Sequence, residues 1–272
     1  MRLILAVLIV LLVLAVAATL DALIYLGQLP SGTRTFSLTE PSNVTKLKVS
    51  DINGYVQVHQ WSRSYVKVNG TESYLPPGVR VLVVRSGTAL TVEVTRPALL
   101  SFLPIPFFVN LQVWVPWNLT ASYSVGDVNG YVQLNLLNFT SLSASTVNGE
   151  VVLNLRNGGE ALASTTNGEI DAAVGPLGKL SLQSVNGEVR LTLTSPVRSG
   201  SYLVSTVNGD VWVTLPGGSG ASVSLATVNG DVKAFGNFTA ETSSSTSFSG
   251  TLGGGGATFL ASTTNGDVIF TG

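Results

Sequence analysis

Residues 146–155 read Thr-Val-Asn-Gly-Glu-Val-Val-Leu-Asn-Leu, and close copies of this stretch recur along the second half of the chain. The first four Asn-Gly pairs lie 19 residues apart, and the next intervals are 22, 21 and 36 residues. A repeat of this length is typical of a solenoid, in which each copy is one structural unit. The asparagines of these pairs, which we interpret as structural turns, are Asn129, Asn148, Asn167, Asn186, Asn208, Asn229 and Asn265.

Apolar and polar residues alternate on both sides of each Asn-Gly pair. After Asn129 the apolar positions are Val132, Leu134 and Leu136, and the same columns recur in the following copies. A period of two indicates a strand with one buried face. Each repeat is therefore predicted to be two short strands joined at Asn-Gly, where both residues tolerate a positive φ.

Two arrangements satisfy this pattern. In a coil, equivalent strands of successive repeats stack in parallel, whereas in a meander each Asn-Gly pair closes an antiparallel hairpin. We favour the coil because the repeats are alike position by position, and like residues stack only when the copies are in register. We interpret residues 247–252 as a degenerate copy of the repeat inside the 36-residue interval.

The ends of the repeat array need protection, because an open edge strand recruits partners or aggregates. An earlier copy of the motif at residues 51–56 and further strand-like segments up to residue 96 suggest a cap. The chain ends on a repeat strand at Gly272. We expect this C-terminal edge either to mediate self-association or to be protected by twist and short length.

The first residues are apolar from Leu3 to Leu20, and Arg2 precedes them. Such a run reaches the length of a transmembrane helix, and the charge order places the remainder outside. A cleaved signal peptide is the alternative, because Ala15-Val16-Ala17 offers a cleavage site. We therefore expect a signal anchor or signal peptide at 1–27, contact with the membrane through residues 3–26, a linker at 28–45, a β cap region at 46–122 and the repeat solenoid at 123–272.

Composition excludes several classes of function. The chain has no Cys and a single His, so it lacks disulfides, thiolate chemistry and most routes to acid–base catalysis. A net charge of −1 gives no electrostatic basis for binding nucleic acid. His59 has no recognisable catalytic partner, and no cofactor motif is present. We predict no enzyme activity, no catalytic residues and no cofactor.

An acidic column follows the Asn-Gly pairs. Stacked carboxylates repel one another unless water or cations neutralise them, and calcium binds such oxygens. The column is thus either a solvated corner or a cation site, although the nonapeptide of calcium-binding β-rolls is absent. Its members are Glu150, Glu169, Glu188, Asp210, Asp231 and Asp267.

Five Asn-x-Thr sequences agree with export, because they are possible glycosylation acceptors. They begin at Asn43, Asn69, Asn118, Asn138 and Asn237.

The strand at residues 113–115, followed by Pro116 and a ladder of Asn-Gly-Asp/Glu-Val repeats, resembles the putative adhesin family. The resemblance covers about residues 46–272. It implies a right-handed parallel β-solenoid in an exported or membrane-attached envelope protein, and it supplies no catalytic residues. With the N-terminal segment, the expected fold class is an all-β right-handed solenoid of roughly 20-residue repeats, with a β cap and one preceding transmembrane helix.

The expected function is that of a membrane-anchored cell-surface structural or adhesin-like protein, single-pass, with its C-terminal domain extracytoplasmic. Its partners would be other envelope proteins or further copies of itself. Outward residues such as Gln133, Asn154, Arg190 and Trp212 would form the working surface. The alternative is an envelope-stress sensor or regulatory module, which would need a separate membrane partner because only Met1 and Arg2 precede the apolar segment.

Overall fold

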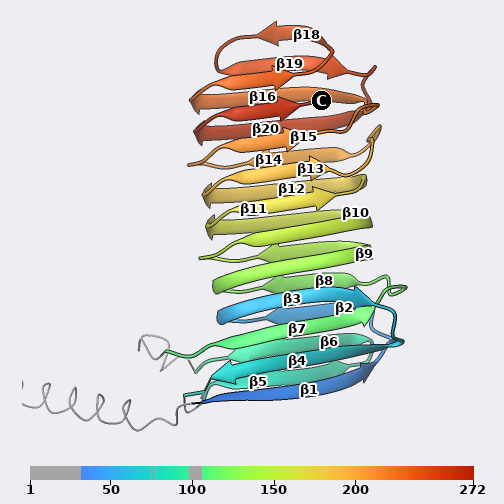
Figure 1. Cartoon of the computed structure of the whole chain (residues 1–272), viewed down its shortest axis with the longest axis vertical. Coiled ribbons are helices and arrows are strands. Elements are labelled where there is room, and N and C mark those ends of the chain that lie inside the picture. Colours follow the sequence, from blue (N-terminus) through green and yellow to red (C-terminus); the bar gives the residue numbers. More distant parts are fainter. Residues whose placement is uncertain (1–31, 74, 77, 98–105) are drawn as a thin grey trace, which may run out of the picture.

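The computed structural model describes residues 32–73, 75–76, 78–97 and 106–272. These residues form a tall stack of strands in which one turn of the chain lies on the next (Figure 1). All of the described strands join one hydrogen-bonded network. The strands of the N-terminal part are β1 (Thr33–Pro41), β2 (Lys46–Ser50), β3 (Asn53–Trp61), β4 (Tyr65–Ser73), β5 (Arg80–Ser86), β6 (Ala89–Thr95), β7 (Val109–Pro116) and β8 (Ser122–Gly126).

The repeats supply the remaining strands. Two of them, β9 and β10, run through a bend and contribute to both broad faces of the stack. The strands are β9 (Asn129–Ser145), β10 (Val151–Asn167), β11 (Ile170–Val174), β12 (Leu177–Asn186), β13 (Val189–Leu193), β14 (Ser201–Ser205), β15 (Val211–Thr214), β16 (Ala221–Asn229), β17 (Val232–Phe235), β18 (Phe238–Ser243), β19 (Ser247–Leu252), β20 (Ala257–Asn265) and β21 (Val268–Thr271).

Successive repeats pair in parallel and in register. Val132 lies opposite Val151, and Ile170 lies opposite Val189, so equivalent positions stack along the axis. The copy at residues 51–56 stacks on the repeats in the same way, with Asn53 opposite Asn129. The parallel coil is therefore confirmed over the series of hairpins, while its right-handed sense stays a prediction.

The predicted apolar columns fill the space between the two faces. Val132, Leu153 and Ala172 are fully buried, and they belong to one continuous core. Burying a leucine side chain contributes about 2 kcal/mol, so each turn adds a similar increment of stability to the turn below.

The N-terminal end is closed by antiparallel strands, as expected of a cap. β4 runs antiparallel to both β1 and β7, and β5 runs antiparallel to β6. β6 and β7 then pair in parallel with the first turn, formed by β2 and β3. Residues 33–41 of the expected linker form β1 and so belong to the cap.

The end of the chain lies inside the stack and not at its edge (Figure 1). β20 pairs in parallel with β14 on one side and β16 on the other, and β21 lies between β15 and β17. The last turn in the sequence is therefore the penultimate turn in space. Because β21 is paired on both sides, the open C-terminal edge that we expected does not exist there.

The prediction of a degenerate repeat inside the 36-residue interval is wrong. Residues 247–252 form β19, which runs antiparallel to β16, and β18 runs antiparallel to β19. Phe238 of β18 packs edge-on against Phe248 and Phe270, with ring centroids 5.1 and 5.8 Å apart. This excursion covers the far end of the stack as a second cap.

The predicted transmembrane helix requires a correction. Within residues 32–73, 75–76, 78–97 and 106–272, no helix is long and apolar enough to cross a membrane. Residues 3–26, on which the prediction rested, lie outside the described residues. The fold class that the structure supports is an all-β stack of parallel turns with capped ends.

Candidate functional site

The turn asparagines form a continuous ladder along one corner of the stack. Except in Asn53, where the ladder begins, each amide nitrogen donates to the amide oxygen of the asparagine in the neighbouring turn, at 2.7–2.8 Å. Stacked amides of this kind stabilise parallel strands in register. In spatial order the ladder is Asn53, Asn129, Asn148, Asn167, Asn186, Asn208, Asn265 and Asn229.

The reason that we gave for asparagine at this corner is wrong. Among the described residues, only glycines have a positive φ. Asparagine is needed for the ladder, and the glycine after it is needed for close packing. A Cβ atom on Gly168 would lie 1.8 Å from the carbonyl oxygen of Gly149 in the neighbouring turn.

The hydroxyl two residues before each asparagine completes the corner. Thr165 Oγ1 donates to the carbonyl oxygen of Gly149 at 3.0 Å, and Ser184 and Thr206 make the same bond at 2.9 Å. These buried hydroxyls satisfy carbonyl groups that the turn leaves without a strand partner. The sequence showed the Thr/Ser column but not its purpose.

Two aspartates replace that hydroxyl at the junction with the cap. Asp51 and Asp127 precede Asn53 and Asn129 by two residues, and both are buried. Each has one side-chain oxygen without a hydrogen-bond partner. Burial, together with the charge of Asp127, raises the pKa of Asp51 to about 8, and burial also raises the pKa of Asp127.

The acidic column exists, but its order differs from the sequence. Asp267 lies between Asp210 and Asp231, because Asp267 N donates to Asp210 Oδ1 at 2.8 Å and Asp231 N to Asp267 Oδ1 at 2.9 Å. Two cations on the same side offset part of the charge. Arg190 pairs with Glu188, and Lys233 pairs with Asp267, at 2.7 and 2.8 Å.

Burial is the main cause that raises pKa values in this column, and neighbouring carboxylates add to it. Burial and the neighbouring Glu169 raise the pKa of Glu150, and burial raises that of Glu188 despite Arg190. In the described part of the chain, no three His, Cys, Asp or Glu side chains gather closely enough to hold a metal ion.

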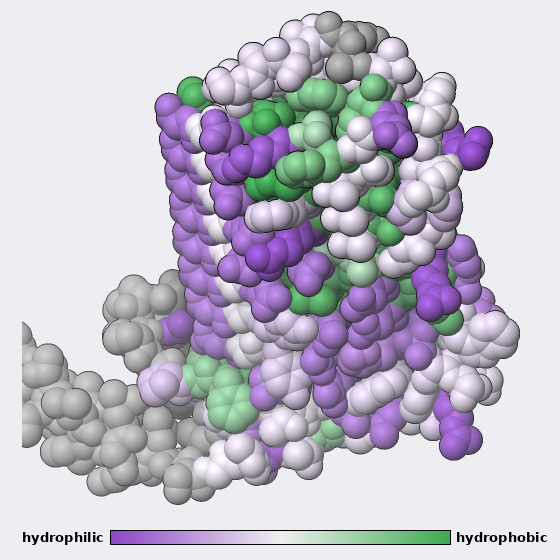
Figure 2. Space-filling view, turned by 45° about the horizontal axis from the view of Figure 1, so that its top comes forward, coloured by the Kyte–Doolittle hydropathy of each residue, from purple (hydrophilic) through white to green (hydrophobic). Residues whose placement is uncertain are grey.

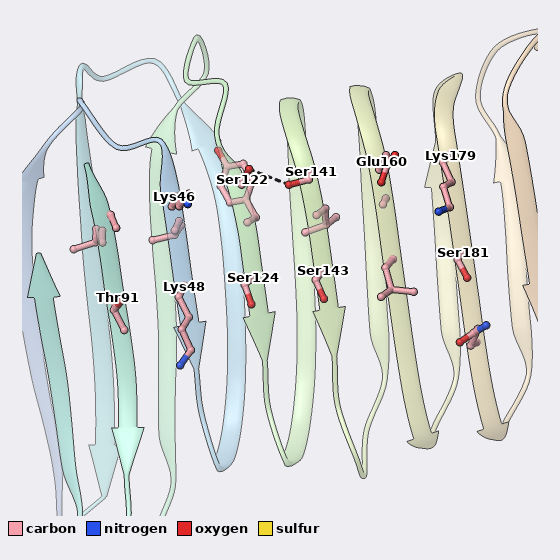
Figure 3. A pocket seen from close by; sticks show the side chains of 18 of the residues that line it. Lys46, Lys48, Thr91, Ser122, Ser124, Ser141, Ser143, Glu160, Lys179 and Ser181 are labelled. Atoms are coloured by element: carbon pink, nitrogen blue, oxygen red, sulfur yellow. Dashed lines mark hydrogen bonds between the residues drawn. The ribbon is translucent and has the colours of Figure 1, made fainter. Parts of the chain in front are cut away.

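A shallow groove of about 820 Å³ crosses one broad face of the stack (Figure 3). Ser122, Ser124, Ser141 and Ser143, from β8 and β9, stand along it, and Ser141 Oγ donates to Ser122 Oγ at 2.9 Å. We call it the hydroxyl groove. It is lined on one side by Lys46 and Lys48 of β2, and on the other by Glu160 of β10 and Lys179 of β12.

The charges of the hydroxyl groove are of both signs. Lys48 Nζ lies 3.7 Å from Glu93, and Glu160 stands opposite Lys179 in the register of β10 and β12. These two carboxylates offset part of the positive charge of Lys46, Lys48 and Lys179.

The opposite face carries amides and aromatic rings in rows across the strands. In one row Gln112 Nε2 donates to Gln57 Oε1 at 3.0 Å, and Gln57 Nε2 donates to Gln133 Oε1 at 2.9 Å. In the next row Asn154 Nδ2 donates to Asn135 Oδ1, and Asn135 Nδ2 to His59 Nδ1, both at 2.8 Å.

Aromatic rings continue the second row toward the cap. The Trp114 ring lies 6.2 Å from both His59 and Trp61, and Trp61 packs edge-on against Tyr65 at 4.9 Å. Trp61 Nε1 donates to the carbonyl oxygen of Tyr65 at 2.9 Å, which fixes the indole. The amide–aromatic surface, as we call it, consists of Gln57, His59, Trp61, Gln112, Trp114, Gln133, Asn135 and Asn154.

Sequence reasoning found this surface only in part. Gln133 and Asn154 were expected to face outward, and they do. Arg190 and Trp212 also face outward but lie on β13 and β15, farther along the stack. Trp114 was missed because its row partners, His59 and Lys67, come from strands far away in the sequence.

The possible glycosylation sites differ in exposure. Asn43, Asn118 and Asn237 are exposed, whereas Asn69 and Asn138 are half-buried. Asn138 Nδ2 donates to the carbonyl oxygen of Trp117 at 3.0 Å. On geometry alone, the three exposed asparagines are the more accessible acceptors.

The fold and corner chemistry define a capped parallel β-solenoid built from Asn-Gly turns. The model of the Toastrack DUF4097 family matches residues 118–270, which is more than half of the chain. The chain belongs to this family.

Comparison with solved structures finds matches among bacterial proteins. One is a putative adhesin from Bacteroides fragilis, with 10% identity over 87% of this chain and 97% of that chain, and a TM-score of 0.44. Another is a putative cell adhesion protein from Clostridium sporogenes, with 12% identity over 89% of this chain and 99% of that chain, and a TM-score of 0.33. No curated protein matches the sequence.

Proposed function

We propose that this protein is a non-catalytic, adhesin-like interaction protein of the cell surface, and that it binds through the amide–aromatic surface. The observation that carries the proposal is the row Trp114, His59, Asn135 and Asn154, which places rings and amides side by side on four adjacent strands. Aromatic side chains with nearby amides are typical of recognition surfaces, since they offer large contact areas at low entropic cost.

The architecture supports a binding scaffold. Side chains on this surface are held by hydrogen bonds to one another and stand on a rigid sheet, so little order is lost when a ligand binds. The adhesin description of the similar Bacteroides fragilis protein agrees with this function but is not its basis.

The location is part of the proposal. An apolar N-terminal run and three exposed Asn-x-Thr sites agree with export. We propose that the strand stack lies outside the cytoplasm, where a surface without catalytic groups can meet other cells or envelope components.

Two measurements on cells that express the full-length chain test the function. Antibody against the strand stack should label intact cells as well as permeabilised ones, which checks the location. Adherence of these cells should fall when Trp114 is replaced by Ala and persist for Trp212→Ala, an exposed tryptophan outside the surface. Equal adherence of both variants would contradict the proposed binding surface.

A further inference from the structure

We infer that the amide–aromatic surface binds an extended, electrically neutral polysaccharide. This inference rests on the proposed function and adds the chemical class of the ligand. It follows from three properties of the surface: its charge, its rings and its ladder of amides.

The surface carries almost no charge. The outward positions of β3, β7 and residues 129–137 of β9 contain no Asp, Glu, Lys or Arg. Two cations adjoin it: Lys67 of β4, with Nζ 5.7 Å from the centroid of the Trp114 ring, and Arg156 of β10, which is exposed two positions after Asn154. Burial lowers the pKa of His59, so its imidazole is neutral at pH 7. These two cations offer a polyanion little complementary charge, and a cationic peptide would find none on these strands.

The rings provide an apolar shelf. Trp114 is tilted by 36° to Trp61 and by 37° to His59, and the three rings are neighbours on this face. The apolar C–H face of a sugar ring stacks on such aromatic groups, while its hydroxyls remain at the rim. Indole also keeps a polar N–H, so Trp114 serves both parts of a sugar.

The amides provide hydrogen bonds at regular intervals. Each ladder bond uses one N–H and one lone pair of the amide, which leaves a second N–H and a second lone pair. Because an amide nitrogen only donates, His59 Nδ1 accepts from Asn135, and His59 Nε2 carries the proton as a further donor. Sugar hydroxyls both donate and accept, and they suit this mixed set.

The direction of the rows favours a chain over a single sugar. Neighbouring strands lie about 4.8 Å apart, so the rows repeat donors and acceptors at that spacing along the stack. The row from Trp114 through His59 and Asn135 to Asn154 crosses four strands. A polymer of repeating neutral units can meet several of these groups at once.

Binding of named polysaccharides to the full-length protein tests the inference. Galactomannan, xyloglucan and dextran are the neutral probes, and alginate and heparin are the anionic ones. Retardation in polysaccharide-containing native gels gives the affinity, and tryptophan fluorescence gives a second readout. We expect at least one neutral probe to bind, with little loss between low and high salt, and the anionic probes to bind more weakly.

Variants locate the binding. Trp114→Ala should weaken binding of that neutral probe by about tenfold or more, equivalent to about 1.4 kcal/mol. Gln57→Ala, which breaks the glutamine row, should weaken it several-fold. Trp212→Ala, on β15, and Ser143→Arg, in the hydroxyl groove, should leave it unchanged. Circular dichroism of each variant checks that the strand stack is intact, and Gln57→Ala keeps the test open if Trp114→Ala does not fold.

The possible results distinguish failure of the neutral-polysaccharide inference from failure of the proposed binding surface. Tighter, salt-sensitive binding of alginate or heparin would overturn the neutral ligand. So would failure of all neutral probes while Trp114→Ala still abolishes cell adherence, in which case the binding surface stands. If Ser143→Arg weakens neutral binding and Trp114→Ala does not, both the inference and the proposed surface fail.

Discussion

At the scale of single residues, the corner of each turn depends on three side chains with separate tasks. Asparagine links the turns through its amide, glycine allows the backbones to approach, and Thr or Ser satisfies a buried carbonyl group. Asp51 and Asp127 depart from this scheme at the junction with the cap.

Replacing Gly168 by Ala should destabilise the protein strongly, by about 3 kcal/mol or more, because the new Cβ would meet a backbone carbonyl that cannot move away. Chemical denaturation measures the change. Gly217→Ala is the matched control, since a Cβ there meets nothing within 4 Å. Similar losses for both variants would show that close approach is not the reason for glycine.

From the burial of these aspartates, we predict that the free energy of unfolding falls as the pH rises. The pKa of Asp51 is 3.8 in its ordinary state and about 8 in the folded protein, so the folded state binds the proton more tightly. Its contribution is therefore complete below about pH 4 and is lost between pH 4 and 8. Thermal unfolding across this range measures the slope.

Asp127→Thr should reduce this pH dependence and raise the melting temperature at pH 8 by a few degrees, or about 1–2 kcal/mol. The variant removes the charge beside Asp51 and restores the hydroxyl of the other turns. Glu160→Gln, an exposed carboxylate elsewhere, serves as the control. An unchanged slope in Asp127→Thr would rule out coupling between the two aspartates.

At the scale of elements, the final two strands, β20 and β21, are each paired on both sides with strands that precede them in the sequence. Phe259 of β20 stacks on Tyr202 of β14 with ring centroids 4.4 Å apart, and β20 is hydrogen-bonded to β16 on its other side. The turn at Asn208 meets the turn at Asn265 across 57 residues of sequence. The native arrangement of this end therefore requires β20 and β21 to insert between strands that precede them in the sequence.

Phe259→Ala should cost about 3–5 kcal/mol, because it leaves a cavity in the core. Hydrogen exchange should show lost protection in both β14 and β16, since β20 lies between them. Leu260→Ala is the control, because this neighbour on the same strand is 46% exposed and should cost little. Loss confined to β16 would contradict the insertion of β20.

At the scale of the whole molecule, the net charge of −1 conceals an uneven distribution. Carboxylates line one corner, and the amide–aromatic surface is nearly neutral. Figure 2 shows a continuous hydrophilic strip along the stack, beside mixed patches near the end that β18 and β19 cover. Repulsion at the acidic corner lowers the stability of the fold, whereas the nearly neutral face is the proposed binding surface.

Added salt should stabilise the protein by screening the acidic column, with a rise of a few degrees in melting temperature between low and moderate ionic strength. Calcium at equal ionic strength should add nothing further, because the described residues hold no cluster of three metal ligands. Glu169→Gln should lessen the effect of salt. A rise specific to calcium would establish a cation site in the column.

The sequence by itself determined the strands, the parallel register and the buried columns, because these depend on a local pattern repeated at fixed spacing. Alternation at Val132, Leu134 and Leu136 reports which side of a strand is buried, and equivalent copies match only in register. The N-terminal cap followed from the need to protect an edge.

Only the tertiary structure decided which strands become neighbours across long separations. Alternation in residues 247–252 is the same for a parallel or an antiparallel strand, so the pattern could not reveal that β19 caps β16. The placement of β21 between β15 and β17, the pairing of Asp51 with Asp127 and the row from Trp114 to Asn154 have the same origin. Side-chain periodicity records burial, while the choice of partner depends on how the whole chain packs.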